Sequence, residues 1–587
     1  MTILASLVRA YDRLGDKAPA QGFSTEKIGF VIPLNEDGSP VGKPIDLREG
    51  EGKKKTSRLI AVPQAVKRTS GVAANFLWDK TAYVLGVTAA EGKTPIKEHQ
   101  CFRDAHFDRL GNIDDPGLLA LRRFLENWKL EEFVRLQWPD DMKDQNVIFA
   151  LECDRRANLW LHDRPAARAL WTNLQASGAA THAVCLVTGE KAPIARLHPA
   201  IKGVWGAQSS GASLVSFNLD AFTSYGHEQG DNAPVSEAAT FAYTTALNLF
   251  LQKGSGHRMQ IGDASTVYWA DASDAATAKD AEDLFADFFE VDEDSEAKKI
   301  TTILKNVRLG RAPADFRPDL PKNVRFHVLG LAPNAARLAI RFYIEDDFGK
   351  IAANFLDHFA RMRIEPPAQD VNPPLWRYLV ETASQRKSEN VPPNLAGEFL
   401  RAILTGAPYP GNLLSTLLMR LRADKEINAL RVSLLKAILL RNHPNFNSEA
   451  PVSLDPANKD PGYLLGRLFA TYEYAQSQAL GGNVNATIRD QYYGAASATP
   501  RAVFPVLQRK VTHHLSRLRK DKPGLAVNLD RDIGEIFELA APDRLFVPTL
   551  TAQRQAMFAI GYYHQRNKFF RPKDEAKTHS NAEGSTK

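Results

Sequence analysis

Residues 67–86 have the sequence KRTSGVAANFLWDKTAYVLG, in which a polar loop runs into an aromatic and apolar segment. Gly71 lets the backbone turn or approach a partner closely. Phe76, Trp78 and Tyr83 offer large apolar surfaces that can anchor the loop. The stretch therefore predicts a glycine-hinged loop held by a buried strand or strand pair. A plain surface loop between two strands is the alternative.

The loop carries groups that suit a nucleic-acid backbone. Lys67 and Arg68 stand just before Gly71, and Ser70 stands beside it. Cations and hydroxyls are common phosphate contacts in proteins that bind DNA or RNA. These residues could contact a phosphate. The sequence alone does not distinguish such a loop from an ordinary solvated one.

Another basic loop lies upstream, at residues 50–58, and contains Lys53, Lys54 and Lys55. It lacks the spacing of a nucleotide-binding P-loop, because Leu47 stands where the first glycine would be. A flexible basic loop that touches a nucleic-acid backbone fits this sequence. A solvated loop without a ligand is the alternative.

Length and composition bound the class of protein. The 587 residues suggest three or four domains, and 44% hydrophobic with 24% charged residues is ordinary for a globular protein. A net charge of +6 permits nucleic-acid binding without requiring it. Three widely separated cysteines exclude a disulfide framework and a zinc ribbon. No signal peptide and no apolar run of about 20 residues is present, so we expect a cytoplasmic protein with no membrane association.

The pattern of elements predicts an α+β fold. Strands are expected at 28–34 and 40–47 as a hairpin, at 147–151, at 183–187, at 260–269 and on both sides of a turn within 326–341. Helices are expected at 117–134, at 164–174 and at 237–251, the last with Ser236 as its N-cap. Beyond about residue 366 strand signals fade, and the sequence predicts helices at 413–440, 463–480 and 503–520.

These patterns divide the chain into four parts. Residues 1–365 form a mixed α/β region with antiparallel hairpins, which contains one domain or two subdomains at about 1–175 and 176–365. Residues 366–460 form a helical connector, residues 461–570 an all-α helical bundle, and residues 571–587 a disordered tail. The acidic stretch from Asp271 to Glu296 is expected to be a solvated helical face or a linker.

Another polar loop lies at residues 201–212, IKGVWGAQSSGA. Its three glycines and its polar residues cannot form a core. Gln208 can bond base edges, and Ser209 and Ser210 can bond phosphates or bases. We expect a loop that reads nucleic acid, and a loop whose polar groups bond one another is the alternative.

The helix expected at 503–520 separates its residues by type. Leu507, Val511, Leu515 and Leu518 share one face, and no acidic residue occurs between Arg501 and Lys520. The basic residues of the helix are Arg509, Lys510, Arg517, Arg519 and Lys520. We interpret the basic face as a nucleic-acid backbone contact, and a surface that only serves solubility is the alternative.

Seven stretches, in this order, resemble the large subunit of the type I-C CRISPR interference (Cascade) complex. They are KRTSGVAANFLWDKTAYVLG, TGEKAPIARLHPAIKGVWGAQSSGASLVSFN, SYG with NAPVSE, FHVLGLAPNAARLAIRFY, GYLLGRLFATYEYAQ, NATIRDQYYGAASATP and IGYYHQR. Each is weak alone, but their joint order is specific, and the resemblance covers most of the chain.

The resemblance implies a non-catalytic subunit of an RNA-guided DNA-surveillance complex, without cofactor or metal. Such subunits recognise the short PAM in duplex DNA, promote unwinding and R-loop formation, stabilise the displaced strand with a small-subunit-like helical bundle, and help recruit the helicase–nuclease. The implied partners are the 5′ handle of the guide RNA, target double-stranded DNA, the backbone and handle-binding subunits, small subunits and the helicase–nuclease.

From chemistry and motif position, we expect two sets of DNA contacts. The PAM and duplex set is Lys53, Lys54, Lys55, Lys67, Arg68, Ser70, Gly71, Asn75, Gln208, Ser209 and Ser210. The displaced-strand set is Arg509, Lys510, Arg517, Arg519 and Lys520.

Two other classes of function stay open at this stage. One is a nuclease, although the carboxylate pairs Asp292 with Asp294 and Asp530 with Asp532 have no neighbouring histidine and fit solvated surfaces. The other is a stand-alone DNA-binding scaffold.

Overall fold

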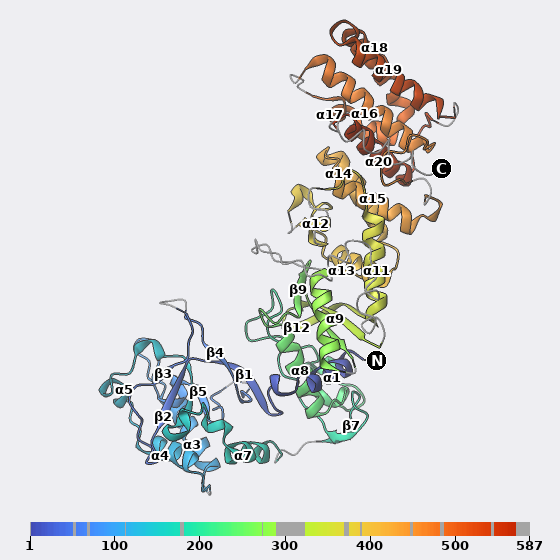
Figure 1. Ribbon diagram of the computed structural model, residues 1–587. Helices are drawn as coiled ribbons and strands as arrows, with labels where there is room; N and C mark the ends of the chain where they lie inside the picture. Colours follow the sequence, from blue (N-terminus) through green and yellow to red (C-terminus); the bar gives the residue numbers. More distant parts are fainter. Residues whose placement is uncertain are drawn as a thin grey trace. The chain divides into compact units, whose positions relative to one another are not determined.

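The computed structural model describes residues 2–50, 55–66, 68, 71–111, 113–176, 181–272, 274–288, 323–368, 375–387, 390–446, 450–481, 486–541 and 545–570. The fold is α+β, with strands up to residue 347 and only helices in the described residues beyond it, so the predicted class is confirmed (Figure 1). The chain forms two compact units. The first unit is Met1–Ile201 with Ser213–Leu249, and the second is Lys202–Ala212 with Phe250–Lys587.

A four-stranded sheet of order β3-β2-β6-β5 forms the centre of the first unit. Strands β2 (Phe30–Leu34) and β6 (Asn146–Leu151) are parallel, and β3 (Ile45–Asp46) and β5 (Trp78–Lys80) add antiparallel at the two edges. The two central strands are buried almost throughout, which explains why their sequences are continuously apolar. The predicted hairpin of residues 28–34 and 40–47 is confirmed by the pairing of β2 with β3.

The first unit also contains two further strand pairs and a set of helices. The antiparallel pairs are β1 (Phe23–Ile28) with β4 (Arg58–Pro63), and β7 (His182–Val184) with β8 (Lys191–Pro193). The helices are α1 (Ile3–Leu14), α2 (Thr81–Val84), α3 (Ile96–Arg109), α4 (Pro116–Asn127), α5 (Glu132–Arg135), α6 (Glu152–Arg155), α7 (Pro165–Ala176) and α8 (Glu237–Phe250). The hydroxyl of Ser236 accepts a hydrogen bond from the amide of Ala239 at 3.2 Å, so its predicted capping of α8 is confirmed.

The second unit begins with an antiparallel sheet of order β12-β11-β10-β9. Its strands are β9 (Arg258–Ile261), β10 (Ala264–Asp271), β11 (Arg325–Asn334) and β12 (Arg337–Asp347). The strand–turn–strand predicted within residues 326–341 is confirmed by β11 and β12. Helices α9 (Ala275–Phe288) and α11 (Phe348–Met362) contribute apolar side chains to the same core as this sheet.

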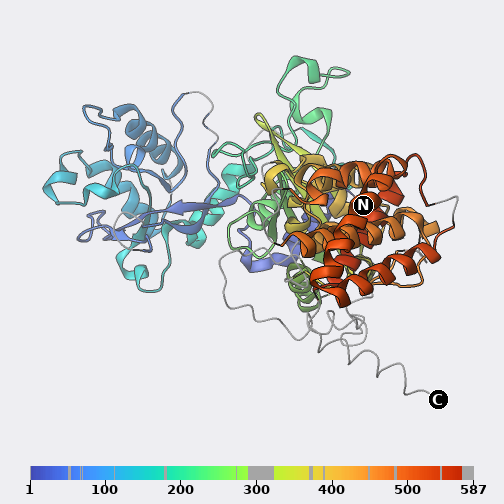
Figure 2. The same ribbon diagram turned by 90° about the horizontal axis from the view of Figure 1, so that it is seen from above.

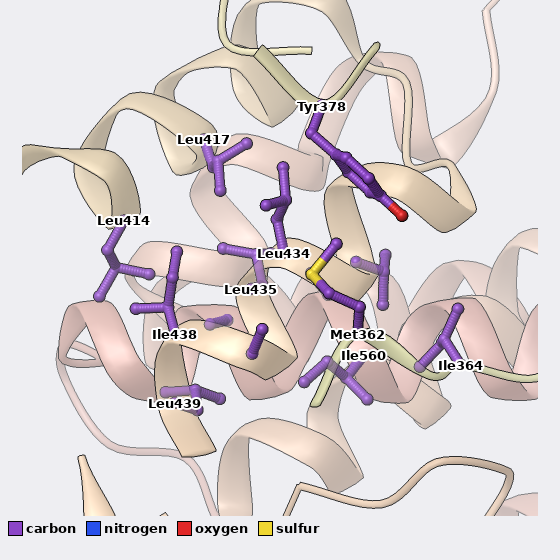
Figure 3. Packing of buried hydrophobic residues seen from close by; sticks show 14 of the residues in the cluster. Met362, Ile364, Tyr378, Leu414, Leu417, Leu434, Leu435, Ile438, Leu439 and Ile560 are labelled. Atoms are coloured by element: carbon purple, nitrogen blue, oxygen red, sulfur yellow. The ribbon is translucent and has the colours of Figure 1, made fainter. Parts of the chain in front are cut away.

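The rest of the second unit is helical. Its helices are α12 (Leu375–Val380), α13 (Pro393–Thr405), α14 (Gly411–Asp424), α15 (Ala429–Asn442), α16 (Pro461–Leu480), α17 (Ile488–Ala498), α18 (Pro500–Asp521), α19 (Pro523–Glu538) and α20 (Ala552–Lys568). Helices α16–α20 lie side by side (Figure 1 and Figure 2). Figure 3 shows Leu434 and Leu435 of α15 packing near Ile560 of α20, within one core that continues through the unit.

Helices α16 and α20 meet backbone to backbone. A Cβ atom built on Gly466 of α16 would lie 2.1 Å from the carbonyl oxygen of Phe558, and one on Gly561 of α20 would lie 2.2 Å from that of Tyr463. A Cβ atom built on Gly462, one turn before Gly466, would lie 2.2 Å from the carbonyl oxygen of Arg554. These three glycines therefore allow a separation that no other residue would permit.

Several predicted elements are wrong in detail. The strand predicted at 260–269 is two antiparallel strands, β9 and β10, and the strand predicted at 183–187 ends at Val184. Of the predicted buried strand or strand pair after Gly71, the single strand β5 is present, and residues 81–84 form helix α2. The helix predicted at 117–134 ends at Asn127, because the backbone of Trp128 is extended and its ring lies against Trp138, with ring centroids 5.1 Å apart. The helix predicted at 413–440 is two helices, since Lys425 adopts a left-handed conformation with φ of 56°. The expected disordered tail and the acidic stretch beyond residue 288 lie outside the described residues.

The close contact of α16 with α20 predicts an asymmetric response to added methyl groups. Gly466→Ala should lower the free energy of unfolding by about 1–3 kcal/mol, because the methyl has no space. Gly534→Ala is the control, since a Cβ there meets no atom within 4 Å and alanine favours the helix by up to about 1 kcal/mol. Denaturant unfolding of both variants measures the difference. Equal stability of the two variants would contradict this packing.

Candidate nucleic-acid interface

The loop around Gly71, residues 64–75, is here called the first loop, and a buried carboxylate holds its base. Asp79 of β5 is fully buried and accepts hydrogen bonds from the backbone amides of Asn75 at 2.9 Å and Lys80 at 2.8 Å. It also forms a short ion pair with Arg68. Burial raises the pKa of Asp79, and these hydrogen bonds and Arg68 act in the opposite direction.

Arg68 is held on three sides. Its guanidinium carbon lies 3.9 Å from the ring centroid of Tyr83, and its Nε donates to the carbonyl oxygen of Ala73 at 2.6 Å, in addition to the pair with Asp79. The side chain is about one quarter exposed. Arg68 therefore shapes the first loop, and only part of its surface is left for a ligand.

Asn75 closes the first loop from inside. Its side chain is buried, and its Oδ1 accepts the backbone N–H of Val66 at 2.9 Å. The predicted base contact by Asn75 stays untested, but in this conformation its amide supports the loop and does not face solvent. Gly71, at the exposed tip, has open space around it and a φ of 82°. This left-handed conformation favours glycine, which suits the predicted hinge.

The aromatic anchors behave as the sequence predicted. Phe76, Trp78 and Tyr83 are buried, and the ring of Phe76 stacks on that of Trp171 with centroids 5.3 Å apart. The anchoring role of all three is confirmed.

A buried histidine fixes the residue after Phe76. Leu77 has φ of 63°, and its amide donates to Nε2 of His106 at 2.9 Å, while Nδ1 of His106 lies 2.7 Å from the carbonyl oxygen of Phe102. The ring is therefore neutral with its proton on Nδ1. Burial lowers the pKa of His106 to about 4.

The basic loop at residues 50–58 is partly described. Glu49 and Thr56 pair across it, and Nζ of Lys55 forms an ion pair with Asp46 at 2.7 Å. Lys53 and Lys54 lie outside the described residues, as do Lys67 and Ser70 of the first loop.

Residues 203–212, here called the second loop, consist of two consecutive tight turns. In the first, the amide of Ala207 donates to the carbonyl of Val204 at 3.1 Å, and Gly206 has φ of 75°. In the second, the amide of Gly211 donates to the carbonyl of Gln208 at 2.9 Å. The buried Val204 and Ala212 anchor the two ends, so the exposed corners between them are held in fixed places.

The polar side chains of the second loop are available to a ligand. Gln208, Ser209 and Ser210 are exposed, and among the described residues their side chains make no hydrogen bond. The alternative, a loop whose polar groups bond one another, holds for the backbone groups of the two turns and not for these three side chains.

Sequence reasoning missed Trp205, which lies at the corner of the first turn. Its side chain is 68% exposed, while its backbone amide donates to the hydroxyl of the buried Ser265 at 2.8 Å. An exposed indole in a fixed loop can stack on a base. Its place between Val204 and Gly206, a buried residue and a turn glycine, is the sequence signal that could have indicated it.

The basic residues of α18 divide into two groups. Arg509, Arg517 and Lys520 recur at helical intervals on one exposed face, with the exposed His513 between them, and we call this face the α18 stripe. Lys510 instead donates to the hydroxyl of Tyr492 at 2.8 Å, and Arg519 pairs with Asp530 of α19 at 2.9 Å. Within the stripe, Arg517 lies 3.9 Å from Asp521.

The predicted site residues thus form separate groups. Arg68 and Asn75 meet at Asp79 in the first unit, and the second loop and the α18 stripe belong to the second unit. Among the described residues, no three His, Cys, Asp or Glu side chains are grouped to hold a metal ion. No helix in the described part of the chain is long and apolar enough to cross a membrane.

Comparison with known proteins gives one family. The family model described as CRISPR-associated protein (Cas_Csd1) matches residues 7–570, nearly the whole chain. No curated protein matches the sequence.

The burial of His106 predicts that the fold loses stability in acid. The folded-state pKa of about 4 lies below the ordinary value of 6.5, so the unfolded chain binds the proton first and stability is lost as the pH falls from about 6.5 towards 4. His106→Gln removes this titration but keeps an acceptor for Leu77. The stability advantage of the wild type should therefore shrink by about 3 kcal/mol between pH 7 and pH 4. Unfolding of both proteins across this range measures it, and a constant difference would contradict the assignment.

Proposed function

Because the chain belongs to the Cas_Csd1 family of CRISPR-associated proteins, the large subunits of type I-C interference complexes, we propose that it recognises the PAM in duplex DNA. In this proposal it also promotes unwinding and R-loop formation, stabilises the displaced strand and helps recruit the helicase–nuclease, without catalysing a reaction itself. The guide RNA 5′ handle, the backbone and handle-binding subunits and the small subunits are its proposed partners.

The observation that carries the PAM-reading role is the second loop. The amide of Gln208 can donate to and accept from one base edge, and Ser209 and Ser210 add hydroxyls beside it. The side chains of all three are exposed and make no hydrogen bond among the described residues. Fixed turns reduce the entropy that would be lost on binding. Trp205, on the adjacent corner, offers a face on which a base can stack.

The first loop supports the same role as a backbone contact. Its tip contains Gly71, where the main chain can approach a phosphate closely. Lys67, Arg68 and Ser70 are proposed to add charge and a hydroxyl, and Lys53, Lys54 and Lys55 to contact the duplex backbone from the neighbouring basic loop. Asn75 is proposed to act through the shape of the loop, since its amide is buried.

The α18 stripe supports contact with the displaced strand. Arg509 and Lys520 are exposed and form no ion pair among the described residues, and they lie eleven residues apart, or about 16 Å along a helix. Over that length the basic side chains of the α18 stripe can contact several phosphates of one strand at once. Arg519 and Lys510 are proposed to contribute after releasing Asp530 and Tyr492, which makes their contribution smaller.

No observation on the described residues favours the nuclease alternative. The carboxylates of the second acidic pair each face a cation, Asp530 meeting Arg519 and Asp532 meeting Lys568. Asp292 and Asp294 lie outside the described residues. Incubation of the purified chain with labelled DNA and Mg²⁺ or Mn²⁺ tests this directly, and metal-dependent cleavage would overturn the non-catalytic role.

Replacement of Gln208 should relax PAM preference. Gln208→Ala removes the proposed base contact, which is worth about 1–3 kcal/mol of discrimination. We therefore expect the ratio of affinities for preferred and poor PAM sequences to fall about tenfold in duplex binding by the reconstituted guide complex. Gln21→Ala, at another exposed glutamine, is the control. If Gln208→Ala keeps full selectivity, Gln208 is not a reader.

Removal of the α18 stripe should change the salt dependence of R-loop binding. Replacing Arg509, Arg517 and Lys520 together by alanine should reduce the slope of log K against log salt by up to about three, roughly one unit for each lost phosphate contact. The control replaces the exposed Lys253, Lys459 and Arg531, which removes the same charge elsewhere on the second unit. Equal slopes for the two triple variants would remove the stripe from the proposal.

A further inference from the structure

Residues 219–232, here called the Tyr225 loop, present the ring of a tyrosine to solvent. Tyr225 is 99% exposed, and it occupies the first corner of a two-residue turn whose second corner is Gly226. Ser224 and His227 pair across this turn, and the amide of His227 donates to the carbonyl of Ser224 at 2.9 Å. Tyr225 therefore stands at the tip of a small hairpin.

The backbone at this tip is unfavourable for tyrosine. Tyr225 has φ of 52° and Gly226 has φ of 78°, the conformation in which turns strongly prefer Asn, Asp or Gly. A non-glycine residue held there costs of order 1–3 kcal/mol. A large ring in a strained position with no contact inside its own unit is best explained by a contact outside the chain.

The loop is also fixed in place. Asn232 accepts a hydrogen bond from the amide of Ser224 at 3.1 Å and donates to the carbonyls of His227 at 3.2 Å and Gln229 at 3.1 Å. A Cβ on Gly230 would lie 2.1 Å from the carbonyl oxygen of Ala195, so the loop is seated directly on the backbone of a neighbouring segment. Such a tip is ordered before it binds, which lowers the entropy cost of association.

The charge around the ring indicates the kind of partner. Asp220 and Glu228 are exposed and Asp231 is partly exposed, and none of the three forms an ion pair among the described residues. The loop contains no Lys or Arg, although the chain as a whole carries a net charge of +6. Three unpaired carboxylates repel phosphates and attract a basic surface.

We propose that the Tyr225 loop is a docking site for a basic protein subunit of the interference complex. The partner offers an apolar pocket for the ring of Tyr225, with Lys or Arg side chains at its rim to meet the three carboxylates. Tyrosine is among the residues that most often dominate protein interfaces from such a central position. This docking is independent of PAM reading, and it concerns assembly before DNA is present.

The test uses the guide complex reconstituted without this chain, and it measures how tightly the purified chain binds to that complex in the absence of DNA. Tyr225→Asn removes the ring and suits the turn better, so its melting temperature should be at least that of the wild type. We expect it to bind at least tenfold more weakly, and Tyr225→Phe to bind within about threefold of the wild type. Val134→Asn, at another exposed apolar residue of the first unit, should bind normally.

Neutral replacement of the three carboxylates, D220N, E228Q and D231N together, tests the charge argument. We expect about threefold weaker binding and a shallower dependence on salt. Wild-type affinity of Tyr225→Asn would overturn the proposal. Tighter binding by the neutral variant, or loss of affinity for naked guide RNA by Tyr225→Asn, would also overturn it, because the ring would then meet nucleic acid or an acidic partner. PAM selectivity is not read in this assay, so its outcome is separate from that of the proposed function.

Discussion

A charge removed from water, the carboxylate of Asp79, is the constraint on which the first loop depends. An unpaired buried carboxylate is strongly unfavourable, so its oxygens must be matched by donors. Two backbone amides and Arg68 provide them. Because those donors come from both sides of the loop, satisfying one carboxylate holds Arg68 beside the segment from Asn75 to Lys80. Gly71, at the exposed tip, makes none of these contacts.

The same construction recurs at the other exposed tips. The second loop is anchored by Val204 and Ala212, and the Tyr225 loop by Asn232, with residues of positive φ making each turn. The second loop presents the side chains of Trp205, Gln208, Ser209 and Ser210 in this way, and the Tyr225 loop presents the ring of Tyr225. The three tips differ in charge and chemistry: a basic glycine hinge, an uncharged loop with an amide, hydroxyls and an indole, and an acidic loop with a phenol. This difference supports separate partners for them, namely the DNA backbone, base edges and a basic protein.

Local patterns in the sequence predicted the fold class, the burial of Phe76, Trp78 and Tyr83, the capping of α8 by Ser236 and the apolar face of α18. Each of these depends on residues a few positions apart. The pairings over long distances in the sequence could not be predicted in this way. Leu77 meets His106, and β2 lies parallel to β6 more than a hundred residues later.

In the candidate site too, local patterns could be predicted and long-range contacts could not. The exposure of Gln208, Ser209 and Ser210 agrees with their polar, glycine-rich sequence. The burial of Asn75 and the pairing of Arg68 with Asp79 depend on how the loop closes. Arg519 is engaged only because α19 turns back beside α18 and brings Asp530 to it. Trp205 was missed because an indole is usually assigned to a core, although Gly206 beside it was a sign of a turn, at whose corner the side chain faces solvent.

The most direct test of the DNA-reading role is duplex binding by the assembled guide complex, with and without this chain, across a library of randomised PAM sequences. The proposed function predicts sharp PAM preference when the chain is present and loss of that preference when it is absent. If the preference persists without the chain, another subunit reads the PAM, and the first and second loops do not have the role proposed for them.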